Sequence, residues 1–129
     1  MLNQFSRTQL LFGPEAMNKL SQCSVAVFGI GGVGGDAVEA LARSGIGMLD
    51  LIDDDRVCLT NLNRQLHATR KTVGKYKVDV AEERVHEINP DCRVNTYKRF
   101  ICPTPGNSLI LRSMIMLLTR LIRSPENCR

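Results

Sequence analysis

The chain has 129 residues, 43% of them hydrophobic, and a formal net charge of +4. This length fits one domain with an ordinary core, and no stretch approaches the roughly 20 apolar residues of a membrane span. Residues 1–100 carry 13 basic and 12 acidic side chains, whereas residues 101–129 carry four arginines and one glutamate. The basicity therefore comes mainly from the tail and is not by itself a sign of nucleic-acid binding.

The cysteine pattern argues against a zinc site. There are five cysteines, an odd number, and no two of them form a CxxC pair. Scattered cysteines of this kind predict reduced thiols in a cytoplasmic protein rather than a disulfide framework. The first residues have neither the basic nor the apolar segment of a signal peptide, so we expect a cytoplasmic location without membrane attachment.

Residues 1–23 are predicted to form a helical lead-in. Apolar residues recur from Phe5 to Leu20, and the Gly13-Pro14 pair is expected to divide the segment into two short helices. Arg7 lies near its start, and the residues alone predict no more for it than a solvated charge.

Residues 24–53 are predicted to form a strand–helix–strand unit. The unbroken apolar run from Val25 to Phe28 is typical of a strand buried on both faces of a parallel sheet. A helix is expected over Asp36–Arg43, with Gly45 as its C′ residue, and a second strand over Met48–Ile52. The connection should be right-handed.

The turn between the first strand and the helix is rich in glycine. Gly29, Gly31 and Gly34 match the GxGxxG pattern, and Asp53 follows Gly34 by 19 residues. Amides at a helix N-terminus attract phosphate, and glycine lets it approach without a Cβ in the way. An acid at this offset commonly binds a ribose. The alternative is a ligand-free turn with an aspartate that ends a strand.

A polar loop, residues 53–74, follows the second strand. A loop this long without secondary structure is usually functional. Because alternate strand residues face opposite sides, Asp53 and Asp55 are expected to share a face and Asp54 to point away. This favours one ribose-binding acid over a three-aspartate metal site. His67 is predicted to be a hydrogen-bonding loop residue rather than a catalytic base, since no partner is fixed by spacing.

A second helix and a third strand complete the pattern. Gly74-Lys75-Tyr76-Lys77 opens a helix whose apolar stripe runs from Val78 to Ile88, Asn89-Pro90 ends it, and residues 93–97 form the strand. A lysine at a helix start opposes the helix dipole. Lys77 is therefore either a solvated lysine or a cation that meets an anionic ligand.

Five motifs together resemble the ThiF/MoeB/HesA adenylating superfamily, relatives of the ubiquitin-activating enzymes. They are GIGGVGG, DDD, TNLNRQLHA, GKYK and EINP, and the resemblance runs from about Phe5 to Phe100. Within the superfamily, FSRTQLLFG, EALARSGIG and NLNRQLHA are similar to the tRNA threonylcarbamoyladenosine dehydratase family. The resemblance implies an α/β fold with a Rossmann-like, mostly parallel sheet and helices on both faces. Residues 24–100 would form the ATP-binding domain, incomplete at its C-terminus.

The resemblance also implies roles for individual residues. Gly29, Gly31, Gly32 and Gly34 would hold the phosphates of ATP, and Asp53 its ribose. Asn61, Arg64 and Gln65 match the phosphate-contacting NxxRQ motif, and Lys77 matches a lysine beside the attacked phosphorus. Arg7 matches an arginine that reaches the partner's ATP in family homodimers. A cation cluster of this kind stabilises charge that grows at the transferred phosphorus.

The reaction implied is carboxylate activation. A carboxylate attacks the α-phosphorus of ATP, pyrophosphate leaves, and in the dehydratases an internal nitrogen of the modified adenosine in tRNA closes a ring and releases AMP. Three alternatives stay open: an adenylyltransferase for a ubiquitin-like sulfur-carrier protein, a non-catalytic nucleotide-binding or dimerisation fragment, and an NAD-dependent oxidoreductase. The cations Arg64 and Lys77 favour a triphosphate over NAD.

The tail, residues 101–129, departs from the family pattern. The family's next strand ends in an Asp-Ala-x-Asp-like motif that helps to hold Mg²⁺, but no aspartate follows Asp91 here. Codons compatible with Ser113–Arg120, read from their third base, can spell Tyr-Asp-Tyr-Val-Val-Asp-Ala, so we hypothesise a shift of reading frame. The alternative is a divergent helix with an apolar face that includes Met116 and Leu117. Either way, we expect ATP binding with weak or absent catalysis.

Overall fold

A computed structural model describes residues 2–99 and 115–118 of the chain. Its elements, in chain order, are α1 (Ser6–Gln22), β1 (Ser24–Phe28), α2 (Gly32–Ser44), β2 (Met48–Ile52), the 3-10 turn η1 (Leu59–Asn61), α3 (Lys77–Ile88), β3 (Arg93–Tyr97) and β4 (Ile115–Leu118). The four strands form one parallel sheet in the order β3-β2-β1-β4. All three strands and both helices predicted between residues 24 and 97 are present, and α2 begins four residues earlier than expected.

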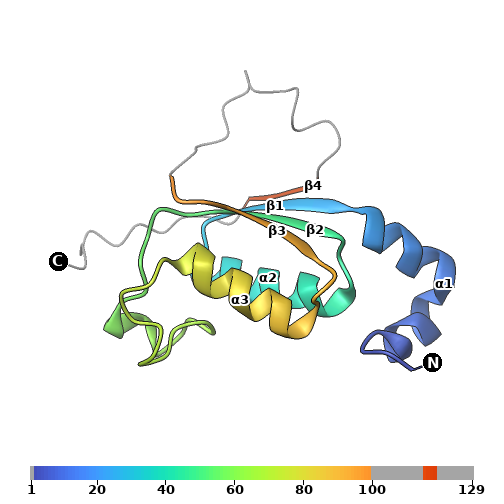
Figure 1. Ribbon diagram of the computed structural model, residues 1–129, viewed down its shortest axis with the longest axis horizontal. Helices are drawn as coiled ribbons and strands as arrows, with labels where there is room; N and C mark the ends of the chain where they lie inside the picture. The colour runs from blue at the N-terminus through green and yellow to red at the C-terminus, as the bar shows by residue number, and fades with distance from the viewer. Residues whose placement is uncertain (1, 100–114, 119–129) are drawn as a thin grey trace, which may run out of the picture.

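Helices α2 and α3 pack side by side on one face of the sheet (Figure 1). Right-handed crossovers that step in one direction, from β1 to β2 to β3, must place both connecting helices on the same face. The direction reverses between β1 and β4, so a switch point lies at the carboxyl end of β1, where ligands of open α/β sheets bind. The α/β, Rossmann-like prediction is confirmed, and within the described residues α2 and α3 cover one face.

The core lies between the sheet and these two helices. Its buried side chains come from alternate positions of β1 and β2, from one stripe of each helix and from the adjoining turns: Val25, Val27, Ile30, Val38, Ala42, Ile46, Leu49, Leu51, Val78, Ala81, Val85 and Cys92. The stripe predicted for the second helix is thus confirmed as its packing face. Burying an aliphatic side chain of this size contributes roughly 1.5–3 kcal/mol relative to leaving it exposed.

The amino end of the sheet is closed by tight turns. Gly45 ends α2 in the left-handed region with φ 91°, as predicted for a C′ residue. A Cβ built on Gly47 would lie 1.9 Å from the carbonyl oxygen of Ser21, so backbone fills this space. The buried Asn89 donates through Nδ2 to the carbonyl oxygen of Ile46 at 3.2 Å. This end is fixed by packing and hydrogen bonds.

Helix α1 precedes the amino end of β1 and extends away from the sheet (Figure 1). It bends at Gly13, whose φ of 82° is non-helical, so the predicted division at Gly13-Pro14 is confirmed. None of its residues is buried, and Leu10 and Leu11 are almost fully exposed.

Three expectations need correction. The loop after β2 is not structureless, because it contains η1 and is bridged at Arg56 to Tyr76. Cys23 and Cys92 are free thiols, but Cys58 is disulfide-bonded, so reduced thiols were wrongly expected there. The helical alternative for the tail is wrong over residues 115–118, which form β4 in register with Val25–Phe28 of β1. The rest of the tail, and with it the reading-frame hypothesis, lies outside the described residues.

Among the described residues, every helix is too short or too polar to cross a bilayer.

Candidate nucleotide-binding site

The glycine turn joins the carboxyl end of β1 to the start of α2. Gly29 takes the left-handed conformation, with φ 88°, and its amide donates to the carbonyl oxygen of Ile52 at 2.8 Å. The chain then enters α2 through Gly31, where no described side chain caps the helix and no acid lies in the first turn. The first amides of a helix have no partner within the helix and carry partial positive charge. This turn therefore presents its amides to an anion.

Space beside the turn matches this chemistry. Among the described residues, a Cβ built on Gly32 would have no heavy atom within 4 Å, and one on Gly31 would meet first Gln65 Nε2, at 3.8 Å. Gly35 differs, because a Cβ there would lie 3.0 Å from His67 Nδ1. Thus Gly31 and Gly32 border open space that a phosphate can enter, whereas the missing side chain of Gly35 makes room for packing.

Asp53 ties the end of β2 to this turn. It is buried, and its Oδ2 accepts the amide of Ile30 at 2.6 Å while its Oδ1 accepts the amide of Asp55 at 2.8 Å. Burial raises the pKa of the Asp53 carboxyl above its usual range, although the two amide donors act in the opposite direction. A carboxylate has lone pairs for further donors, so a ribose hydroxyl is compatible with these contacts.

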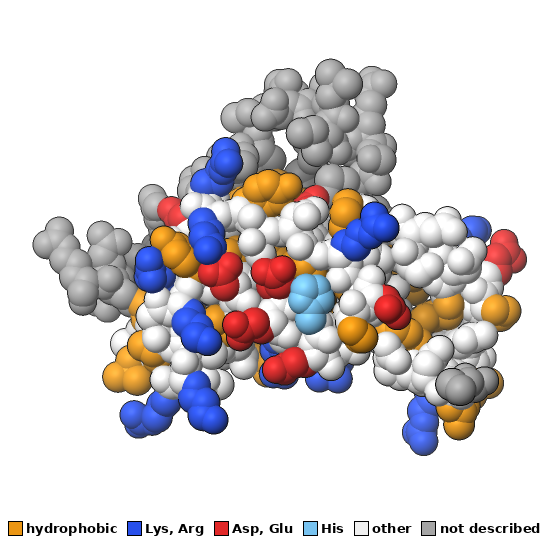
Figure 2. All heavy atoms as spheres, viewed as in Figure 1, with side chains coloured by type: hydrophobic (Ala, Val, Ile, Leu, Met, Phe, Trp, Pro, Cys, Tyr) orange, Lys and Arg blue, Asp and Glu red, His pale blue; other side chains and the backbone are white. Residues whose placement is uncertain are grey.

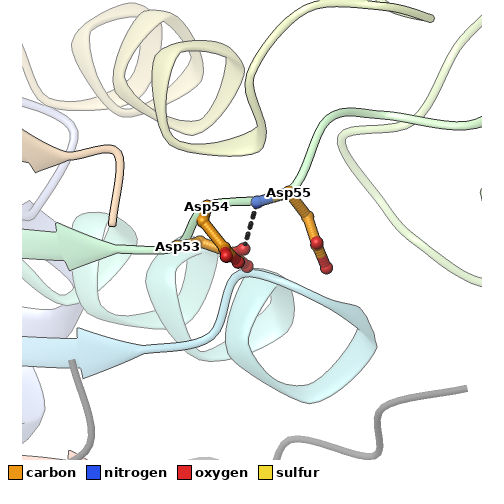
Figure 3. A group of neighbouring side chains, drawn as sticks. All are labelled: Asp53, Asp54 and Asp55. Atoms are coloured by element: carbon orange, nitrogen blue, oxygen red, sulfur yellow. Dashed lines mark hydrogen bonds between the residues drawn. The ribbon is translucent and has the colours of Figure 1, made fainter. Parts of the chain in front are cut away.

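The three consecutive aspartates point the same way (Figure 3). One carboxylate oxygen from each of the three lies within 4.8 Å of the other two. The expectation that Asp54 faces away from Asp53 and Asp55 is therefore wrong. Strand β2 ends at Ile52, so the alternation of a strand does not extend to these residues.

Lys77 is brought beside these acids from the first position of α3. Its side chain is 8% exposed, its Nζ lies 3.6 Å from Asp55 Oδ2, and its amide donates to the carbonyl oxygen of Asp55 at 3.1 Å. It is the one buried lysine or arginine within residues 2–99. A buried cation is costly unless anions face it. The site thus holds a desolvated ammonium next to acids and near the glycine turn.

The loop contributes two buried amide side chains. Asn61 Oδ1 accepts the amide of Cys58 at 2.9 Å and so shapes η1. Gln65 is buried beside Gly31, and its Oε1 has no hydrogen-bond partner among the described residues. Buried polar atoms are rarely left unpaired, so a group with a donor at this position, such as a bound ligand or water, fits the site.

Two predicted residues are not assembled with the others. Arg64 is exposed, and its Nη1 donates to the carbonyl oxygen of Thr60 and to Asn63 Oδ1. Arg7 is exposed on α1, which lies at the opposite end of β1 from the glycine turn (Figure 1). Within one chain, Arg7 therefore does not reach the turn.

His67 differs from its predicted role as a hydrogen-bonding loop residue. It is buried against Gly35, and neither ring nitrogen has a hydrogen-bond partner within the described part of the chain. Burial, with the nearby cations Lys77 and Arg84, lowers the pKa of His67 to about 4. The imidazole is thus neutral near pH 7. Gly35 in the helix was the available sequence signal, since a glycine there leaves room for a packed ring.

A parallel strand, a glycine turn and a helix that begins at that turn, with a buried lysine beside aspartates, define a Rossmann-like domain. The chain belongs to the ThiF family, which it matches over residues 5–119. The superfamily inferred from the motifs is therefore confirmed.

Three similar proteins show where in the family the chain lies. It is 53% identical over 100 residues to the tRNA threonylcarbamoyladenosine dehydratase of Bacillus subtilis, covering 78% of this chain and 39% of that protein. The crystal structure of the Escherichia coli tRNA N6-threonylcarbamoyladenosine dehydratase with ATP is 49% identical, with a TM-score of 0.75, over 76% of this chain and 40% of that one. A sulfur carrier protein adenylyltransferase of Thermus thermophilus is 37% identical over 98 residues, covering 74% of this chain and 36% of that protein. The chain thus spans about two fifths of the length of its similar relatives.

Proposed function

We propose that this chain provides the ATP-binding region of a tRNA threonylcarbamoyladenosine dehydratase. The observation that carries the proposal is the open, uncapped glycine turn of α2, with the buried Lys77 and Asp53 beside it. Support comes from the dehydratase of Bacillus subtilis at 53% identity and from the Escherichia coli dehydratase, whose structure contains ATP.

Each site residue has a role in this proposal. The amides around Gly29, Gly31, Gly32 and Gly34 hold the phosphates, Asp53 accepts a ribose hydroxyl, and Asn61 and Gln65 border the phosphates from the loop. Lys77 neutralises charge that grows at the attacked phosphorus. Arg64 leaves its loop partners to reach the β- and γ-phosphates, and Arg7 is supplied by the second subunit of a homodimer.

The chemistry requires no general base in its first step. A carboxylate is ionised near neutral pH, so its oxygen attacks the α-phosphorus directly and pyrophosphate leaves. A nitrogen of the same modified adenosine then attacks the activated carbonyl, the ring closes and AMP leaves, for a net loss of water. The protein contributes positioning and charge neutralisation, which carry most of the catalysis in such transfers.

Mg²⁺ enters this proposal with ATP. The carboxylates of Asp53, Asp54 and Asp55 are oxygen ligands of the kind Mg²⁺ accepts, but Asp53 already accepts two amides and Asp55 pairs with Lys77. The three acids therefore do not fit as a ready set of metal ligands.

ATP binding is tested by thermal shift with ATP and with NAD. We expect ATP with Mg²⁺ at about 100 times its Kd to raise the free energy of unfolding by roughly 2.7 kcal/mol, and NAD at the same concentration to have little effect. Equal shifts would favour the oxidoreductase alternative.

Pyrophosphate release with threonylcarbamoyl-modified tRNA tests the reaction. We expect weak release from this chain, because no aspartate follows Asp91 to match the family's Mg²⁺ acid. Robust release would contradict that expectation.

The second candidate is activation of a sulfur-carrier protein, favoured by the Thermus thermophilus adenylyltransferase. A pull-down with a carrier ending in Gly-Gly, set beside one with modified tRNA, separates the two candidates. Retention of the carrier alone would replace the tRNA proposal.

Light scattering during size exclusion tests the homodimer, and cell fractionation tests the proposed cytoplasmic location.

A further inference from the structure

The loop between β2 and α3 carries charge of one sign. From Arg56 to Lys77 the sequence has six lysines and arginines and no acid. Lys77 and Arg64 belong to the proposed nucleotide site. The other four are exposed and are called here the basic loop surface: Arg56, Arg70, Lys71 and Lys75. Lysine and arginine side chains gather on the left of the molecule in Figure 2, the side on which this loop lies in Figure 1.

These cations are poorly neutralised within the chain. Arg70 and Lys71 have no carboxylate partner among the described residues, and Lys75 Nζ lies 4.0 Å from Glu83 Oε2, with both side chains about half exposed or more. Arg56 donates to the carbonyl oxygen of Gly74 and lies 4.1 Å from the ring centre of Tyr76. Charges of this kind retain counterions that a polyanion can release.

Backbone hydrogen bonds hold the basic loop surface in place. The amide of Gly74 donates to the carbonyl oxygen of Val57, and the amide of Val57 donates to that of Lys75, both at 2.9 Å. The Thr72 hydroxyl accepts the amide of Thr69 at 2.8 Å and closes the turn that presents Arg70 and Lys71. Cations on a fixed turn lose less freedom on binding than cations on a flexible tail.

The same contacts place the surface beside the nucleotide site. Residues 74–77 run next to residues 55–57, through the bridge between Arg56 and Tyr76 and the bond from the Lys77 amide to Asp55. Residues 55–57 begin two positions after Asp53. A polyanion bound to the loop would therefore lie at the carboxyl end of the sheet, next to Lys77 and the glycine turn.

We propose that the basic loop surface binds the phosphate backbone of the RNA whose modified nucleoside enters the site, an inference that rests on the proposed function. Contacts to nucleic-acid phosphates come largely from lysine and arginine. Protein–protein interfaces are instead depleted in lysine, and two of the four residues are lysines. An RNA strand therefore fits this surface better than an acidic protein does.

The test measures binding of a fluorescein-labelled, unmodified tRNA transcript by anisotropy, without ATP. Arg70→Gln/Lys71→Gln is compared with Lys19→Gln/Arg93→Gln, which removes the same charge from α1 and from the amino end of β3. At about 0.1 M salt we expect the loop variant to bind at least roughly tenfold more weakly. Its salt dependence should be shallower by about 1.5, since each lost phosphate contact reduces the slope by nearly one. The control should change binding less than about twofold.

The inference is overturned if the protein without substitutions does not bind tRNA, if the loop variant binds as well as that protein does, or if both variants lose binding equally. It is also overturned if the loop variant loses binding to an acidic carrier protein but keeps its binding to tRNA. Thermal unfolding of each variant with and without ATP separates this result from the proposed function. An ATP shift that persists while tRNA binding ignores the loop charges rejects the inference alone. An absent ATP shift in the unmodified protein rejects the proposed function, whatever the loop binds.

Discussion

The two ends of the sheet use the same residue type for opposite purposes. At the amino end, Gly47 is required because backbone occupies the space of its side chain, and the buried Asn89 donates to the turn there. At the carboxyl end, Gly32 borders open space, and the buried Gln65 and His67 have ring or carbonyl atoms without partners among the described residues. Both ends keep a buried side-chain oxygen without a partner among the described residues, Asn89 Oδ1 at the amino end and Gln65 Oε1 at the carboxyl end. Only the carboxyl end combines such an atom with space beside a glycine turn that a ligand can enter. Four substitutions test this contrast.

Gly47→Ala should have the largest effect. Its Cβ would lie 1.9 Å from the Ser21 carbonyl oxygen, so the lead-in and β2 must move apart. We expect the free energy of unfolding to fall by at least about 3 kcal/mol, measured by urea denaturation. Gly32→Ala is the matched control, since it adds the same methyl group where there is room. Gly13→Ala would not serve as a control, because Gly13 has a positive φ that strains an alanine. Equal losses for the two variants would contradict the contrast.

His67→Leu should remove a pH dependence at the carboxyl end. The folded-state pKa of His67 is about 4, below its usual 6.5, so the neutral ring stabilises the fold fully above pH 6.5. This stabilisation is lost as the pH falls toward 4, by up to about 3 kcal/mol at 1.36 kcal/mol per pKa unit. The difference in unfolding free energy between the original protein and the variant, followed from pH 7 to pH 4, should decrease accordingly. A pH-independent difference would show that the ring titrates normally.

Gly32→Ala should weaken binding of the ligand and leave the fold unchanged. Within the described part of the chain, the added methyl group meets no heavy atom within 4 Å, but it enters the space assigned to phosphate. We expect stability within about 1 kcal/mol of the original, because alanine also suits a helix start better than glycine does. ATP affinity, measured by calorimetry, should fall roughly tenfold, or about 1.4 kcal/mol. Unchanged affinity would place the phosphates elsewhere.

Glu39→Gln should have the smallest effect, because its contacts lie between the two ends. Glu39 bonds to Arg84 across the α2–α3 contact and to Arg43 one turn along α2. Hydrogen bonding from Arg84 holds the pKa of Glu39 below its usual 4.5. We expect a loss of about 1 kcal/mol, since these arginines are partly exposed. The loss should be full above pH 4.5 and fade as the pH falls through the folded-state pKa. A variant as stable as the original at pH 7 would contradict it.

The sequence predicted the framework well because its signals are local. Apolar runs placed β1 and β2, a 3- and 4-residue spacing placed the core face of α3, and Gly13-Pro14 placed the bend of α1. The site was predicted in part. Asp53, Gln65 and Lys77 lie near the glycine turn, but Arg64 faces its own loop and Asp54 turns toward its neighbours. The roles of these residues toward ATP remain predictions.

The sequence by itself determined the order of the elements, the glycine turn and the family of the chain, because propensity, spacing and motif are all properties of neighbouring residues. Only the tertiary structure decided that Asp53 bonds to the amide of Ile30, 23 residues away. It also decided that His67 is buried against Gly35, and that the cations of the loop share the end of the sheet where the glycine turn opens. Such contacts depend on which segments the folded core brings together, and no local pattern records them.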